Sequence, residues 1–174
     1  MADELELVPA YEFPEQSFDD FFDEATQIAS ASLIEDGGHA PLVFVCAAGS
    51  VWGFDITQFY ATPEGRDALL NGMWEIFGGR AIWFVRVCEA WEASDENLDI
   101  RPSENPQRRE VLIVSGMNLN GKRRSRHFPM VRDRSGKLIR LGRPKVHRDT
   151  QDVLQAPLFG RPLVHIVSVS DIPD

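Results

Sequence analysis

The chain has 174 residues, a formal net charge of −9 and a composition that is 43% hydrophobic and 26% charged. This is the size and composition of one ordinary globular domain, and we expect residues 1–174 to fold as a single unit. Its apolar runs are too short to cross a bilayer, its N-terminus lacks a signal-peptide pattern, and two cysteines are too few for a disulfide framework. These features favour a cytoplasmic protein without membrane contact.

The charge is unevenly distributed along the chain. Residues 1–100 contain 20 acidic and 3 basic side chains, whereas residues 101–148 contain 14 basic and 3 acidic ones. The first 65 residues contain no lysine or arginine. Such asymmetry is a hint of contact with nucleic acid or with another partner. The favoured alternative is a basic segment that folds back on acidic helices, so that much of the charge imbalance cancels within the chain.

The hydrophobic pattern predicts two helices. Residues 1–16 contain two prolines and scattered acids, which favours an extended lead-in or an edge strand. Apolar residues then recur at helical spacing after Ser17, and again after Thr62 and Pro63, which are favoured residue types at a helix start. Glycine pairs, which favour a helix end, follow both runs at Gly37 and Gly38 and at Gly78 and Gly79.

The other apolar runs predict strands, most of them joined by short turns. In chain order these strands cover residues 41–48, 50–56, 80–91, 109–119, 122–132, 137–141 and 163–169. Residues 92–107 form a polar loop of unusual length, and residues 142–157 read as irregular, with one helical turn at 150–154. The order predicts an α+β fold with a largely antiparallel sheet of five or six strands and two helices on one side. The strand at 80–91 is apolar on both faces and is therefore expected to be central.

Familiar catalytic and metal-binding motifs are missing from the sequence. It contains no phosphate-binding glycine loop, no H-E-x-x-H and no G-x-S-x-G. The four histidines and two cysteines stand singly, so we predict neither a metal site nor a cofactor. Cys46 and Cys88 lie in apolar strands, where a thiol is expected to be buried and inert.

An enzyme would have to use scattered polar residues. The weak candidates are Glu89, His127 and Arg132, which would surround a cleft beside the long loop of a hydrolase. The alternative is a structural role, in which Glu89 pairs with one of the arginines of residues 101–148.

The basic run KRRSRHF at 122–128 is the candidate for direct nucleic-acid binding. Alternation along a strand places Lys122, Arg124 and Arg126 on one face with an aromatic neighbour, and Arg132 extends this surface. The alternative is that lysine and arginine protect a sheet edge against aggregation.

One region resembles a known group of proteins. The segments are CEAW at 88–91, RPSENPQRREVLIV at 101–114 and MVRDRSGKLIRL at 130–141. They resemble uncharacterised bacterial and phage proteins that share E-A-W, then R-P-S-E-x-P-x-R-x-E, then R-D-x-x-G. The resemblance implies a bacterial or phage origin, and it implies no activity.

The sequence as a whole favours a small non-catalytic intracellular binding protein with a charge-polarised surface. Acidic residues of the first helix would contact the partner, which is more readily a protein than a nucleic acid. These residues are Asp19, Asp20, Asp23 and Glu24. The hydrolase and direct nucleic-acid binding through residues 122–148 are the alternatives.

Overall fold

A computed structural model of the chain describes residues 5–60, 62–92, 108–146 and 158–159. The loop predicted at 92–107 (beyond its first residue), the helical turn at 150–154 and the strand at 163–169 lie outside these residues. The described elements comprise two α-helices, one 3-10 turn and eight strands. They are β1 (Tyr11–Pro14), α1 (Phe18–Asp36), β2 (Leu42–Ala47), β3 (Ser50–Asp55), η1 (Thr57–Phe59), α2 (Pro63–Phe77), β4 (Trp83–Glu92), β5 (Arg109–Asn118), β6 (Arg123–Arg132), β7 (Leu138–Leu141) and β8 (Lys145–Val146).

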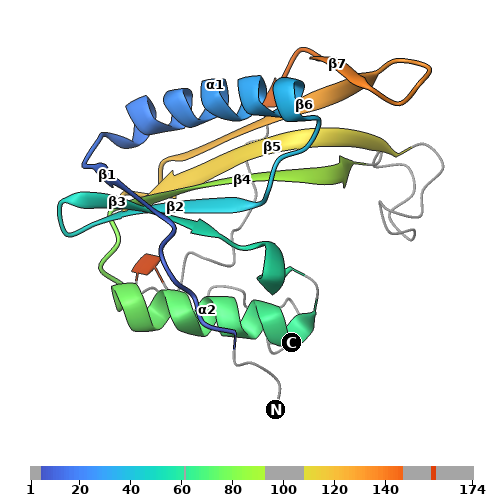
Figure 1. The fold of residues 1–174 in the computed structure, drawn as a ribbon. Coiled ribbons are helices and arrows are strands. Elements are labelled where there is room, and N and C mark those ends of the chain that lie inside the picture. The colour runs from blue at the N-terminus through green and yellow to red at the C-terminus, as the bar shows by residue number, and fades with distance from the viewer. Residues whose placement is uncertain (1–4, 61, 93–107, 147–157, 160–174) are drawn as a thin grey trace, which may run out of the picture.

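The strands form one antiparallel sheet, which curls around the first helix (Figure 1). Their order is β1-β3-β2-β4-β5-β6-β7, with β8 paired to β6. The predicted α+β class, the antiparallel sheet and the central position of β4 are confirmed. The sheet is larger than the five or six strands predicted, because β1 and β8 add to it. Both strands are too short to show a periodic pattern in the sequence. Strand β1 lies within residues 1–16, for which an extended lead-in or an edge strand was predicted.

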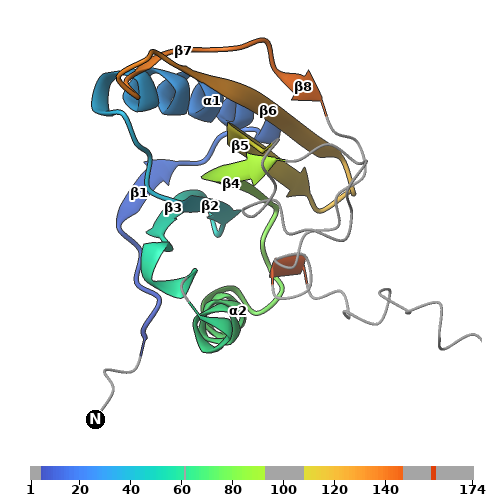
Figure 2. The ribbon, with the colours of Figure 1, turned by 90° about the vertical axis from the view of Figure 1, so that its right-hand side faces the viewer.

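The two helices lie on opposite faces of the sheet, and the prediction that both lie on one side is wrong (Figures 1 and 2). The reason is that β2 and β4 bury side chains on both faces. Val45 and Phe84 pack in the cluster under α2, whereas Cys46 and Val85 pack in the cluster under α1. Central strands that are apolar on both faces need cover on both.

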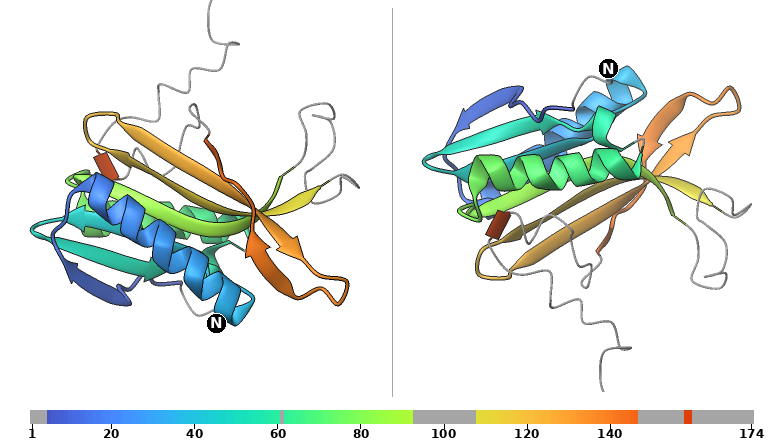
Figure 3. Two further views of the ribbon diagram at one scale, coloured as in Figure 1. Left: turned by 90° about the horizontal axis from the view of Figure 1, so that it is seen from above. Right: turned by 90° about the horizontal axis from the view of Figure 1, so that it is seen from below.

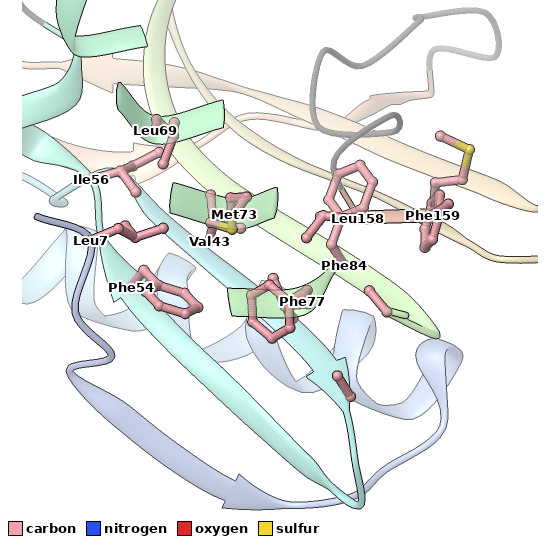
Figure 4. Close-up of a cluster of buried hydrophobic side chains, with 14 of the residues drawn as sticks. Leu7, Val43, Phe54, Ile56, Leu69, Met73, Phe77, Phe84, Leu158 and Phe159 are labelled. Atoms are coloured by element: carbon pink, nitrogen blue, oxygen red, sulfur yellow. The ribbon is translucent and has the colours of Figure 1, made fainter. Parts of the chain in front are cut away.

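Each helix contributes one apolar stripe to its own core cluster. Figure 4 shows the α2 side, where Leu69, Met73 and Phe77 meet Phe54 and Phe84. On the other side, the buried stripe of α1 runs from Phe18 to Leu33 and packs on β4 and β5. The sheet therefore has two cores.

Both helices begin and end where the sequence predicts. The hydroxyls of Ser17 and Thr62 accept a hydrogen bond from the backbone N–H three residues further on, at 3.1 and 3.0 Å. Gly37 and Gly78 adopt left-handed φ values of 77° and 56° at the C-termini, a conformation that glycine adopts at little cost.

Strand β5 approaches β4 and α1 so closely at Gly116 that no side chain fits there. An added Cβ would lie 2.4 Å from the carbonyl oxygen of Phe84 and 3.0 Å from the ring of Phe18.

We expect Gly116→Ala to lower the free energy of unfolding by at least about 2 kcal/mol, measured by urea denaturation. The control is Gly38→Ala, where no atom lies within 4 Å and we expect a change below about 1 kcal/mol. Equal effects of the two substitutions would contradict this account of β5.

Candidate functional site

The acidic face of α1 and the basic strand β6 contact each other. Asp19 and Asp23 are one helical turn apart, and Lys122, Arg124 and Arg126 lie on the side of the β6 segment that faces α1. The four contacts are Lys122 Nζ to Asp19 Oδ2 at 2.6 Å, Arg124 Nη1 to Asp19 Oδ1 at 3.0 Å, Arg124 Nη2 to Asp23 Oδ1 at 2.7 Å and Arg126 Nη2 to Asp23 Oδ1 at 3.4 Å. We call these five residues the ion-pair seam. For them, the interpretation that the charges cancel within the chain is confirmed.

Arg124 is the centre of the seam. Its side chain is only 19% exposed, and its guanidinium lies 4.3 Å from the ring centre of the fully buried Phe22. Arg126 lies over the same ring at 5.5 Å. The two guanidinium groups thus lie over a ring of the α1 core and also pair with the aspartates. The seam is part of the tertiary packing as well as of the surface.

The hydrolase candidates do not form one site. Glu89 pairs in register with Leu112, which packs in the α1 core, so Glu89 points to the α1 side of the sheet. His127 pairs with Ile113, one residue further along β5, and therefore points to the α2 side. A cleft lined by both residues is excluded by this alternation.

Arg132 pairs with the carboxylate of Glu110, a pair that the sequence analysis did not predict. Its Nε and Nη2 donate to the two carboxylate oxygens of Glu110 at 2.5 and 3.2 Å, and its Nη1 donates to the carbonyl of Gly136 at 3.1 Å. Hydrogen bonding to Glu110 raises the pKa of Arg132 further. This residue fixes the β6–β7 hairpin to β5. All four residues predicted to bind nucleic acid therefore take part in ion pairs within the chain.

His127 is paired with Glu92, which sequence reasoning missed. His127 Nδ1 lies 3.1 Å from Glu92 Oε1, and Arg109 Nε donates to Oε2 of the same carboxylate at 2.7 Å. Burial alone would raise the pKa of Glu92, but the hydrogen bonds from Arg109 and His127 outweigh it and lower that pKa. Glu92 stands at the border between strand and loop in the sequence. The cluster of Glu92, Arg109 and His127 depends on strand pairing, because the β4–β5 register pairs Glu92 with Arg109 and β6 brings His127 beside them.

Two serine hydroxyls are buried near this cluster. Ser115 and Ser125 pair in register across β5 and β6, on the same face as His127. Their Oγ atoms are buried and have no hydrogen-bond partner among the described residues. A nucleophilic serine needs a hydrogen-bonded base, and the part of the chain that the structure describes offers neither of these two serines one. Cys46 is no better a nucleophile, because burial raises the pKa of its thiol to about 11.

A groove lies on the other flank of α1, away from the seam. It has a volume of about 280 Å³ and lies between α1 and the strands β1 and β2. We call it the β1 groove. Its walls are largely aromatic and aliphatic, from Tyr11, Phe13, Phe21, Ile28, Phe44 and Val87. Seen from above, α1 crosses the sheet with β1 on one side and β6 on the other (Figure 3).

The aromatic rings of the groove form a continuous wall. The ring centroids of Phe21 and Phe44 are 5.1 Å apart, and the ring of Phe13 lies 6.3 and 6.2 Å from these two. Gly53 lets the wall close, because a Cβ there would lie 3.0 Å from both Phe44 and Tyr11. Part of this surface stays in contact with solvent: Tyr11 is 49% exposed, Phe13 37% and Ile28 60%.

The charge at the β1 groove is negative. Glu24 lines it and is exposed, and Asp20 lies one helical turn before Glu24 and is also exposed. Tyr11 and His39 are the other titratable residues in the lining, and Nδ1 of His39 lies 2.6 Å from the carbonyl oxygen of Ala40. None of the lining residues is lysine or arginine. Of the four acids predicted to bind a partner, Asp19 and Asp23 are in the seam and Glu24 lines the groove, whereas Asp20 is exposed one helical turn before Glu24, outside the lining.

Comparison with protein-family models, with curated proteins and with solved structures finds no match for this chain. Within the described ranges, no three His, Cys, Asp or Glu side chains come together as metal ligands would. No helix in those ranges is long and apolar enough to span a membrane.

The first test of the seam concerns stability. Arg124 has two carboxylate partners and one ring partner, so we expect Arg124→Ala to cost about 1–2 kcal/mol of unfolding free energy. Lys122→Ala removes a pair whose two side chains are 53% and 50% exposed, and we expect it to cost less than about 0.5 kcal/mol. Urea denaturation of both variants measures the difference. If the Lys122 variant loses as much as the Arg124 variant, packing on Phe22 is not what gives the seam its strength.

The second test concerns acid stability at Glu92. Because the pKa of Glu92 is lowered in the folded protein, its ionised carboxylate contributes to the stability of the fold, and this contribution is complete at neutral pH. That contribution is lost as the pH falls through the lowered pKa, since the unfolded chain takes up the proton first. We expect Glu92→Gln to be less stable than the wild type at pH 7 and to lose less stability between about pH 5 and pH 3. Parallel pH profiles of the two proteins would contradict this prediction.

Proposed function

We propose that this protein is a small non-catalytic intracellular binding protein that engages a positively charged protein partner. Asp20 and Glu24, together with the β1 groove beside them, would form the binding surface. The bacterial or phage origin implied by the sequence resemblance is part of the same proposal.

The observation that carries the proposal is the division of charge along α1. Asp19 and Asp23 are neutralised by Lys122, Arg124 and Arg126. Asp20 and Glu24 on the same helix stay exposed, Glu24 in the lining of an apolar groove, and the chain contains no lysine or arginine before Arg66. Apolar surface rimmed by charges of one sign is typical of a site for a partner of the opposite charge.

The alternatives receive less support from the geometry. Lys122, Arg124, Arg126 and Arg132, proposed for nucleic acid, already have carboxylate partners. Several other exposed cations of the described basic segment lie near or beyond the β6–β7 hairpin. They include Arg134, Lys137, Arg140, Arg143 and Lys145.

Affinity capture from a lysate of the source cells tests the proposal. Half of the lysate is treated with nuclease. We expect a basic protein to be captured in both halves, and to be lost with the double variant Asp20→Lys, Glu24→Lys. The matched control is Glu64→Lys, Glu75→Lys on α2, which makes the same change of charge on exposed positions and also alters one first-turn acid.

Three outcomes would overturn the proposal. Capture that requires intact nucleic acid would favour the basic residues around the β6–β7 hairpin. A partner retained by the Asp20, Glu24 variant would exclude this flank of α1. Capture of no partner in either half would contradict a stable binding function.

A further inference from the structure

The β1 groove has the dimensions of a pocket for one side chain. Sites for small-molecule ligands usually enclose about 300–1,000 Å³, and this groove, at about 280 Å³, lies just below that range. A single leucine, phenylalanine or tryptophan from a partner would occupy much of it. Pockets of this kind accept the anchor residues that dominate the affinity of protein interfaces.

The wall of the groove is suited to an apolar anchor. Phe13, Phe21 and Phe44 form its aromatic side, and Ile28 lies exposed on the helix side. Ala25 and Ala29 also line it from α1. Small side chains at these positions leave room between the helix and the sheet. An anchor would bury the exposed parts of Phe13 and Ile28, and this apolar burial would favour binding.

The negative charge near the groove indicates which residue types of the partner would flank the apolar anchor. Glu24 lines the groove and Asp20 lies one turn away on α1. The lining residues contain no lysine or arginine that would neutralise these carboxylates. A segment with lysine or arginine next to its apolar residue would therefore pair with both carboxylates, and an acidic segment would be repelled.

The backbone of β1 is a less suitable contact. This edge strand has only four residues and ends in Pro14, and Pro9 precedes it in the sequence. Proline has no N–H to donate, and short proline-containing edges resist the addition of another strand. Recognition through a side chain in the groove is favoured over strand addition.

We infer that the β1 groove binds a basic peptide segment of a partner protein by taking up one bulky apolar side chain, while Asp20 and Glu24 pair with the neighbouring cations. This inference rests on the proposed function and adds the chemistry of the bound segment.

Selection from a random twelve-residue peptide library on the full chain tests the inference. We expect enriched peptides to carry a leucine, isoleucine, methionine, phenylalanine or tryptophan flanked by lysine or arginine. An enriched peptide should bind Ile28→Gln about tenfold more weakly than wild type, since truncation at an anchor pocket has effects of this size. The matched control is Ile34→Gln, the same substitution on the same helix at an exposed position outside the groove, with unchanged affinity.

A direct readout makes the test independent of the variants. Titration of the peptide should shift the NMR signals of the Ile28 methyl groups and the Phe13 ring, and leave those of Ile34 in place. Replacing the apolar residue of the peptide by serine should abolish these shifts.

The outcomes separate this inference from the proposed function. If Glu24→Lys abolishes peptide binding but Ile28→Gln does not weaken it, the acidic flank binds and the groove does not take up an anchor. Enrichment of peptides without an apolar residue has the same meaning. If no peptide is enriched, or if enriched peptides shift signals elsewhere on the protein, the inference is wrong.

Discussion

The fold depends on two central strands that are apolar on both faces. Because β2 and β4 bury side chains above and below the sheet, neither face can remain in water, and each receives one helix. With a single helix on the α1 face, the curled sheet extends beyond that helix on both sides. The seam occupies one of these margins and the β1 groove the other. Both features therefore follow from the pattern of the central strands.

Helix α1 has two unlike flanks beside its buried stripe. Asp19 and Asp23 bind β6, and Arg124 joins this ionic contact to the core through Phe22. On the other flank, Glu24 and Ile28 border the groove. The ionic flank holds the far half of the sheet against the helix, and it pairs three cations of the basic segment with carboxylates of the same chain. The flank that remains open is acidic and apolar, which is the basis of the proposed function.

The β4–β5 register explains why the hydrolase candidates fail as a site. A strand alternates its side chains, so one residue of difference in register places Glu89 and His127 on opposite faces. The β4–β5 register also brings Glu92 beside Arg109, and the β5–β6 register brings His127 to the same carboxylate. Which carboxylate meets the histidine is decided by pairing between strands that are separated in the chain by residues 93–107. No local pattern in the sequence carries that information.

The sequence by itself determined both helices with their caps, the central position of β4, the antiparallel class and the sides of β6 that its basic residues occupy. These are local properties, set by periodicity, capping side chains and glycine conformation. Tertiary structure decided the placement of the helices on opposite faces, the addition of β1 and β8, and the neutralisation of Lys122, Arg124 and Arg126 by Asp19 and Asp23. Their partners are about a hundred residues away in the chain. Opposite charges at that separation in sequence do not reveal from their spacing whether they meet each other or a partner.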